Sequence, residues 1–150
     1  MAWDGWDFVL GTWEGEGGGE PGKATAGGFT FSPDLDGRIL VRRSFTEFPA
    51  SGSRPGFRHE DLIIVENDSA GTTRATYWDN EGHRIDYDVT VSKEPRTITF
   101  QSRAPLAAER ARFVYWDRGP GRLEFTFDLA PAGNPTFTTH VRGTARRVNR

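Results

Sequence analysis

Hydrophobic and polar positions alternate along most of the chain. In residues 83–92, Ile85, Tyr87 and Val89 fall on one face, whereas Arg84 and Asp86 fall on the other. Alternation with a period of two residues is typical of a half-buried antiparallel strand. Comparable segments separated by turn sequences predict about ten strands, which cover residues 10–19, 24–32, 38–48, 57–66, 73–79, 83–92, 97–102, 111–117, 123–129 and 137–148.

The segments between the predicted strands are short and rich in Gly, Pro, Asn and Asp, which are turn-forming residues. Trp3, Trp6 and Leu10 recur at helical spacing and predict a short helix or 3₁₀ turn, a helical plug at one end of the barrel. Residues 103–110 are the only other helix candidate. Because no long helical pattern could connect parallel strands, the chain is predicted to be an all-β antiparallel sandwich or barrel.

The first predicted strand favours a barrel, because Gly11, Trp13, Gly15 and Gly17 share one parity. Glycine inside a strand costs about 0.5–1 kcal/mol relative to alanine. Chains accept that cost where a strand bends sharply, as the closure of a barrel requires. We therefore expect a closed ten-stranded barrel with Trp13 sealing one end, wide enough to hold one small ligand.

Length, composition and charge exclude several classes of protein. The length of 150 residues fits one domain, residues 1–150. The absence of cysteine excludes disulfides and thiolate metal sites, and a net charge of −2 gives no indication of a nucleic-acid partner. No apolar run approaches the ~20 residues that span a bilayer, and the N-terminus lacks the features of a secretory signal. A cytoplasmic protein with no membrane partner is expected.

The chain has three histidines, at positions 59, 83 and 140. His83 shares a face with Ile85 and Tyr87, so it is either a residue near the barrel mouth held by a neighbour such as Asp79 or a polar anchor for a ligand. A pairing of His83 with Asp79 would also suit a hydrolase or isomerase. His59, next to Glu60 and Asp61, suggests a surface ion pair.

Rings dominate the predicted inward faces, with 11 Phe, 5 Trp and 3 Tyr in the chain. Either these rings simply fill the barrel or they line a lumen for a small apolar or amphipathic molecule. The sequence identifies no catalytic residue, and it is compatible with a homodimer. The candidate ligand-binding residues are His83, Tyr87, Phe113, Tyr115 and Phe125.

Both ends of the chain resemble a known family. The motif Gly11-x-Trp13-x-Gly15-x-Gly17 resembles the start of the nitrobindins, which are ten-stranded calycin-like barrels that bind haem. The segment from His140 to Val148 is similar to their His-Leu-x-x-x-x-basic-basic-Val ending. This resemblance implies that His140 binds the iron of ferric haem, and that the protein acts on nitric oxide or peroxynitrite. Strict alternation instead places His140 on the solvent face, unless a bulge shifts the parity.

Most of the chain also resembles a group of bacterial lipocalin-like proteins of unknown function. That resemblance includes the glycine–tryptophan start and four further segments, which are Asp36-Gly37-Arg38, His59-Glu60-Asp61-Leu62, Tyr77-Trp78-Asp79-Asn80-Glu81-Gly82-His83 and Thr144-Ala145-Arg146-Arg147. This group does not require histidine at position 140. Both resemblances imply a calycin- or lipocalin-like barrel, and they differ on haem.

Overall fold

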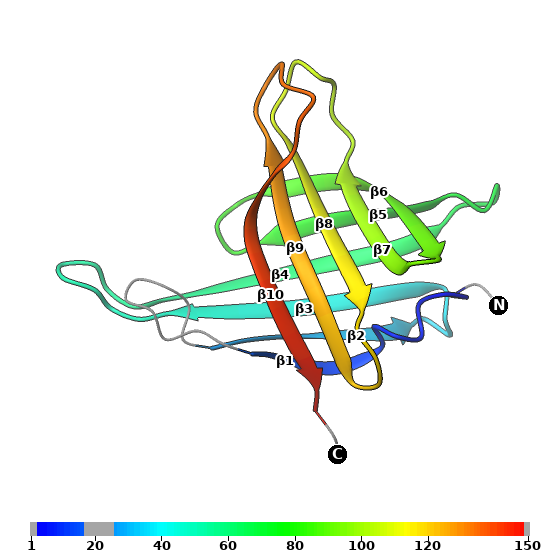
Figure 1. Ribbon diagram of the computed structural model, residues 1–150, viewed down its shortest axis with the longest axis horizontal. Helices are drawn as coiled ribbons and strands as arrows, with labels where there is room; N and C mark the ends of the chain where they lie inside the picture. Colours follow the sequence, from blue (N-terminus) through cyan, green and yellow to red (C-terminus); the bar gives the residue numbers. More distant parts are fainter. Residues whose placement is uncertain (1–2, 17–25, 149–150) are drawn as a thin grey trace.

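Ten antiparallel strands form a closed barrel in the computed structural model, which describes residues 3–16 and 26–148 (Figure 1). Each strand pairs with its neighbours in the chain, and β1 pairs with β10 to close the barrel. The predicted all-β barrel is confirmed, and strand ends agree to within two residues throughout the described segments. The strands are β1 (Gly11–Glu16), β2 (Ala26–Asp34), β3 (Ile39–Phe48), β4 (Phe57–Asn67), β5 (Thr73–Asp79), β6 (Arg84–Lys93), β7 (Arg96–Ser102), β8 (Arg110–Asp117), β9 (Arg122–Ala130) and β10 (Thr138–Arg147).

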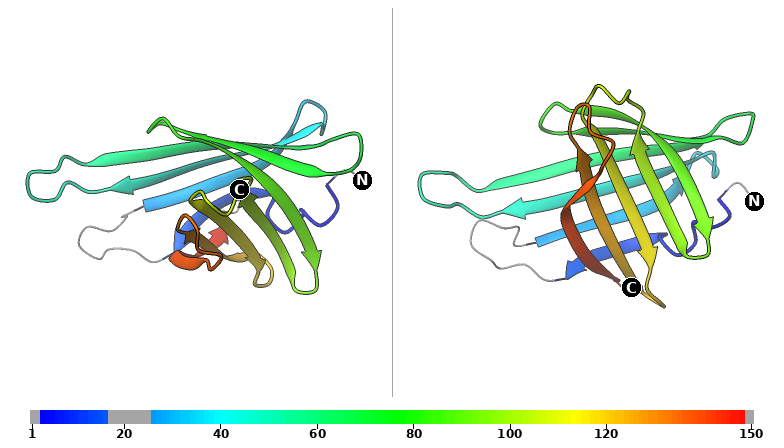
Figure 2. Two further views of the ribbon diagram at one scale, coloured as in Figure 1. Left: turned by 90° about the horizontal axis from the view of Figure 1, so that it is seen from above. Right: turned by 45° about the horizontal axis from the view of Figure 1, so that its top comes forward.

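The barrel is flattened, with β1 to β5 running crosswise to β8 to β10 (Figure 2). Closure joins Trp13 of β1 to Arg147 of β10 in register, and Gly15 to Ala145. Gly11, Trp13 and Gly15 of the opening motif all lie in β1, whereas Gly17 lies outside the described residues.

The N-terminal segment covers one end of the barrel, but not as the predicted helix. It forms two successive turns, in which the Trp6 N–H donates to the Trp3 carbonyl and the Val9 N–H donates to the Trp6 carbonyl. Gly5 interrupts helical geometry because its φ is +87°, a left-handed value that favours glycine. The Trp3 indole donates to the carbonyl of Gly37 in the β2–β3 turn at 2.6 Å, which ties the segment to this end.

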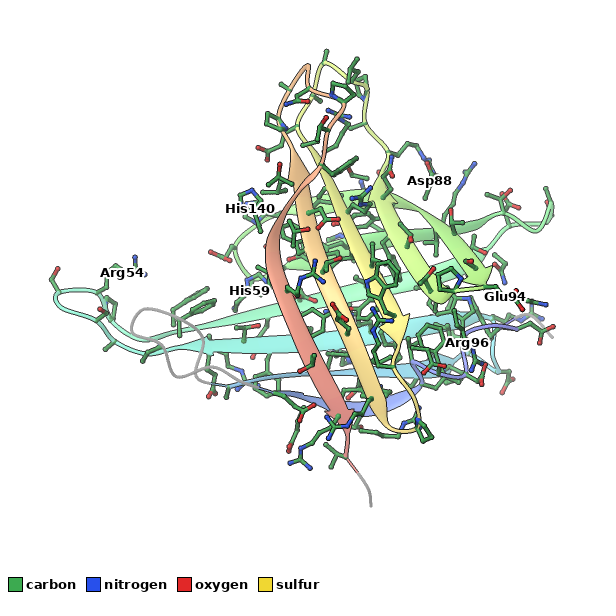
Figure 3. The ribbon with its side chains drawn as sticks, viewed as in Figure 1. Arg54, His59, Asp88, Glu94, Arg96 and His140 are labelled. Carbon is green, nitrogen blue, oxygen red and sulfur yellow. The ribbon has the colours of Figure 1, made fainter. Side chains whose placement is uncertain are left out.

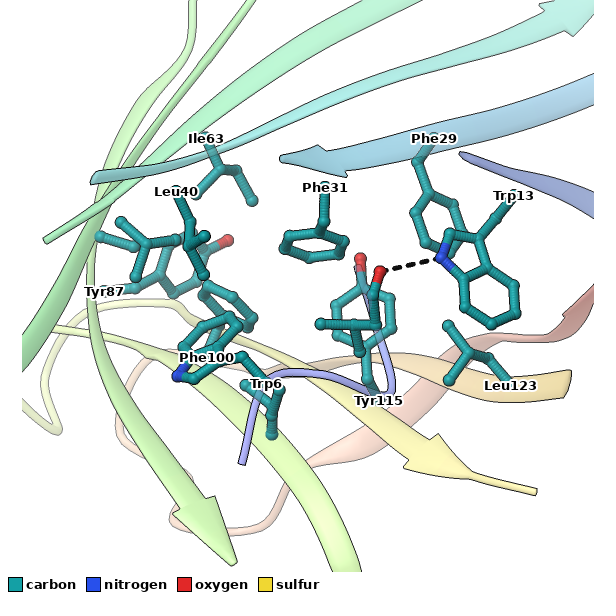
Figure 4. Packing of buried hydrophobic residues seen from close by; sticks show 14 of the residues in the cluster. Trp6, Trp13, Phe29, Phe31, Leu40, Ile63, Tyr87, Phe100, Tyr115 and Leu123 are labelled. Carbon is teal, nitrogen blue, oxygen red and sulfur yellow. Dashed lines mark hydrogen bonds between the residues drawn. The ribbon is translucent and has the colours of Figure 1, made fainter. Parts of the chain in front are cut away.

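Tightly packed rings fill the interior next to this closed end (Figure 4). Trp6 is 2% exposed and meets the rings of Phe31 and Phe100 at 6.2 and 5.9 Å between centroids. Trp13 is buried, stacks on Phe29 and donates its indole N–H to the Val9 carbonyl. Rings therefore close this end, and Trp13 lies where the glycine–tryptophan motif predicts.

The opposite end carries the β3–β4, β5–β6, β7–β8 and β9–β10 connections, and we call it the mouth. Residues 103–110, the other helix candidate, form no helix: the Ala108 N–H donates to the Pro105 carbonyl in a turn, and Arg110 begins β8. Within the described residues, no helix has the length and apolar character needed to cross a membrane.

Candidate functional site

The predicted ligand-binding residues do not all lie in one place. Tyr87 and Tyr115 are inside the barrel, 0% and 2% exposed, and Phe113 and Phe125 are half-buried on the same inward surface. His83 lies outside β6 in the turn at the mouth, and its side chain is 64% exposed. The structure thus groups four of the five residues and leaves His83 at the rim.

Unexpectedly, the lumen contains a buried ion pair. Arg42 of β3 donates to Asp61 of β4 at 2.6 Å, and both side chains are 7% exposed. The guanidinium also lies against aromatic faces, with Cζ 5.5, 5.7 and 5.9 Å from the ring centroids of Phe29, Phe113 and Tyr115. A cation within about 6 Å of a ring face is attracted to it, so both a carboxylate and three rings hold Arg42.

A hydrogen-bonded chain continues from this pair towards the mouth. The His59 ring lies between two carboxylates, with Nε2 3.2 Å from Asp61 and Nδ1 2.7 Å from Glu81. The Tyr77 hydroxyl is 3.3 Å from His59 Nε2 and donates to Asp79 at 2.9 Å. Asp61 of β4 and Asp79 of β5 are opposite each other in the register. His59 and Tyr77 lie two positions before them in the same strands, so all four side chains are on the same face of the sheet. The hydrogen bonds therefore run from Arg42 to Asp79.

Asp79 also organises the β5–β6 turn. Its carboxylate accepts the backbone N–H groups of Glu81 and His83 at 2.9 and 3.0 Å, and the His83 ring lies 2.9 Å away. The predicted contact between His83 and Asp79 is therefore confirmed. It fixes a turn at the mouth and leaves His83 mostly in solvent, so no enclosed catalytic pair results.

Burial and charge shift the pKa values in this cluster. Burial alone would raise the pKa of Asp79, but hydrogen bonds from the His83 backbone N–H, the Tyr77 hydroxyl and the His83 ring lower it to about 2. Burial, together with the charges of Asp61 and Asp79, raises the pKa of Tyr77. Burial would lower the pKa of Arg42, but Tyr115 and Asp61 outweigh it. At neutral pH the cluster thus combines a charged Arg42, an ionised Asp79 and a protonated Tyr77.

Three potential metal ligands meet at the mouth, although the spacing of His and carboxylate residues in the sequence gave no indication of them. Atoms of His59, Asp79 and Glu81 lie within 4.8 Å of one another. Asp79 already accepts hydrogen bonds from Tyr77 and from the β5–β6 turn. The group is therefore accounted for by the hydrogen-bonded chain described above.

His140 lies on a bulge near the N-terminal end of β10. The register shifts between Thr139 and Val141, so His140 is the extra residue of the strand, and it is exposed. In Figure 3, His59 and His140 both lie towards the side from which the hairpin carrying Arg54 projects. A histidine that binds a metal usually donates its second ring N–H to a fixed partner, and no described residue is hydrogen-bonded to the His140 ring. The His140 ring therefore lacks a second residue that would orient it as an iron ligand.

The sequence pattern contained a partial signal for the residues that were missed. Arg42 shares parity with the buried Leu40, and Asp61 shares parity with the buried Ile63. A charge on the parity of buried apolar residues indicates a polar group directed inwards. The signal was ambiguous because both faces of residues 38–48 mix apolar and charged side chains. His59, predicted as a surface residue, is only 20% exposed at the mouth for the same reason.

Together, the fold and the site define a closed antiparallel barrel with one ring-filled end and a polar cluster inside the other. A scan against protein-family models found no match, and a search of curated proteins found no significant relative. Function is therefore argued from the geometry of the lumen.

Proposed function

We propose that the protein binds a small amphipathic molecule in the mouth half of its lumen. The observation that carries this proposal is the exposure of inward-facing apolar residues near the mouth. Val141 faces Phe127 across the β9–β10 ladder and is nevertheless 50% exposed. Phe113, Phe125 and Phe127 are also only half-buried, although they pack against the core. Protein atoms thus leave this part of the inward surface accessible.

A hollow in the size range of small-ligand sites lies at the same end of the barrel. A hollow of about 370 Å³ opens where β6 begins, β7 ends and β8 begins, and charged side chains such as Arg84, Asp86 and Arg103 form much of its wall. Ligand sites commonly measure about 300–1,000 Å³ and combine apolar walls with a few polar groups. Its wall also includes Ile85, which precedes Tyr87 on the inward face of β6, and Ser102, which is opposite Tyr87 in the register. Neither the half-buried rings nor the Arg42–Asp61 pair lines this hollow. A molecule that enters at the mouth would reach them deeper in the lumen, with its apolar body against the rings and its polar group at the pair.

Occlusion of the mouth tests the proposal. The probe is N-phenyl-1-naphthylamine, an uncharged dye whose fluorescence rises in apolar surroundings. Val141→Trp places a bulky ring on the inward side of β10, at a site that is open to solvent. Thr144→Trp places the same ring on the exposed outer side of the same strand. We expect Val141→Trp to weaken dye binding at least about tenfold, which corresponds to 1.4 kcal/mol, and Thr144→Trp to leave it unchanged. Equal affinities of the two variants, or no binding by the unmodified protein, would refute the proposal.

Ferric haem bound through His140 is the alternative ligand. What favours it is the position of His140 on the bulge beside the exposed Val141, where an incoming ligand could reach the imidazole. The lack of a fixed partner for the ring gives it less support than the lumen proposal. Titration with hemin tests this alternative. A Soret band that differs between the unmodified protein and His140→Ala would support haem ligation by His140. Identical spectra would exclude His140 as the ligand.

A further inference from the structure

Two buried donors in the lumen have no hydrogen-bond partner among the described residues. They are Nε of Arg42 and the hydroxyl of Tyr87, on side chains that are 6% and 0% exposed. Most buried polar groups in proteins are paired, because an unpaired group loses its contacts with water without compensation. Figure 4 shows the Tyr87 hydroxyl directed into the interior, towards Ile63. A donor aimed into a lumen indicates where an acceptor of a ligand would sit.

Both donors belong to side chains that lie near the ring of Phe113. The ring of Phe113 lies 5.7 Å from the guanidinium carbon of Arg42 and 6.2 Å from the ring centroid of Tyr87. The charge of Arg42 also influences the hydroxyl of Tyr87. One ligand group lying over Phe113 could therefore approach both donors. Phe113 itself is half-buried on the accessible part of the inward surface.

The charges around these two donors favour a neutral acceptor over an anion. Asp61, 2.6 Å away, already balances the charge of Arg42. Arg42 is the only arginine or lysine that the described strands direct into the mouth half of the lumen, whereas Asp61 and Asp79 both carry carboxylates there. An anionic head group would thus add a further negative charge without a cation to match it. Burial raises the pKa of Tyr87, which keeps its hydroxyl a donor.

We propose that the ligand presents a neutral carbonyl-type oxygen to Arg42 Nε and the Tyr87 hydroxyl, with its apolar body against Phe113, Phe125 and Phe127. This assignment rests on the proposed lumen binding and adds the chemical class of the head group. It predicts that ketones, aldehydes, esters or amides on an apolar ring or chain bind better than the corresponding carboxylates or hydrocarbons.

Three probes with one ring system test the head group. They are 2-acetylnaphthalene, 2-ethylnaphthalene and 2-naphthoate, titrated by calorimetry at pH 7. Because a hydrogen bond to a buried donor typically contributes about 0.5–1.5 kcal/mol, two such bonds should make 2-acetylnaphthalene bind about tenfold or more tightly than 2-ethylnaphthalene. The naphthoate should bind more weakly than 2-acetylnaphthalene. Tyr87→Phe should weaken the acetyl probe about three- to tenfold and leave the ethyl probe unchanged.

Tyr77→Phe is the matched control, because it removes a hydroxyl that already donates to Asp79 within the protein. Infrared spectroscopy provides a second readout. The carbonyl stretch of bound 2-acetylnaphthalene should lie at lower frequency in the unmodified protein and in Tyr77→Phe than in Tyr87→Phe. Equal affinities of the acetyl and ethyl probes, a preference for naphthoate, or equal effects of the two tyrosine variants would overturn the head-group assignment.

The failure of this inference is distinguishable from the failure of the proposed function. If the uncharged dye binds in the lumen and none of the naphthalene probes does, the head-group assignment is wrong and lumen binding stands. If neither the dye nor any probe binds to the unmodified protein, the proposed function fails and the head-group assignment fails with it.

Discussion

Replacing Arg42 by methionine should strongly destabilise the barrel. Arg42→Met keeps much of the side-chain volume but leaves the carboxylate of Asp61, 7% exposed, without its 2.6 Å partner. Removing one member of a buried ion pair typically costs about 3–5 kcal/mol, because the remaining charge is then buried without compensation. The contacts of the guanidinium with three ring faces, each of about 0.5–1 kcal/mol or more, are lost in the same substitution and are included in such measured totals. We expect a loss of about 4 kcal/mol.

Such a loss is easily measured. Urea unfolding, monitored by tryptophan fluorescence, gives the free energy of unfolding, and calorimetry should show a melting temperature lower by about 8–16 °C for a chain of this size. Arg146→Met is the control, because Arg146 and Glu14 form an exposed pair at 2.9 Å with side chains 58% and 53% exposed. Exposed pairs contribute about 0–1 kcal/mol, so this variant should unfold almost like the unmodified protein.

The double variant Arg42→Met/Asp61→Leu separates the two contributions. If the cost of the single variant comes from the unpaired carboxylate, replacing that carboxylate by an apolar side chain should restore most of the stability. Buried ion pairs replaced by apolar residues of similar volume are often neutral or stabilising by about 1–4 kcal/mol. A single variant that loses less than about 1 kcal/mol, or a double variant that is less stable than the single one, would refute this reasoning.

Two further predictions concern the mouth and the closed end. Since the pKa of Asp79 is about 2 in the folded state and 3.8 ordinarily, its ionised form should stabilise the fold by about 2 kcal/mol above pH ~4, relative to Asp79→Asn. That advantage should shrink as the pH falls towards 2, and a gap in urea-unfolding energy that does not change with pH would contradict it. Gly5→Ala should cost about 1–3 kcal/mol more than Gly82→Ala in thermal melts, because overpacking carries such costs. Both glycines have positive φ, but a Cβ at Gly5 would lie 2.7 Å from Val91, whereas nothing lies within 4 Å at Gly82. Equal melting temperatures would show that this contact relaxes freely.

The sequence predicted the strands well because each strand carries its own local signal. Alternation in residues 83–92 and turn residues such as Gly82 are patterns that extend over only a few positions. They can therefore be recognised without knowing which strands pair. The prediction of a helix at the N-terminus was wrong, also for a local reason. The spacing of Trp3, Trp6 and Leu10 suits both a helix and consecutive turns, and Gly5 with its positive φ decides for turns.

The site was harder to predict, because it depends on which strands are paired and in which register. Arg42 and Asp61 are 19 positions apart and meet only because β3 and β4 form a hairpin in which Ser44 is opposite Asp61. The sequence of residues 38–48 alone does not show which face of the strand points inwards, because both faces mix apolar and charged side chains. His140 shows the same limit, since alternation gives no sign of the bulge that places it outside the regular ladder.

The buried ion pair links the stability of this barrel to its proposed role. A lumen filled only by apolar side chains would avoid the cost of burying Arg42 and Asp61, and the closed end shows that this chain can build such packing from rings. Replacing a buried charged pair by apolar residues is often neutral or stabilising for the fold. The stability of the fold therefore does not explain why the mouth half contains such a pair, whereas recognition of a ligand would. It follows that Arg42→Met/Asp61→Leu should fold at least as stably as Arg42→Met, while its preference for 2-acetylnaphthalene over 2-ethylnaphthalene should fall to the part that Tyr87 contributes. A double variant that keeps the full preference would show that the pair is structural and does not contribute to recognition of the ligand.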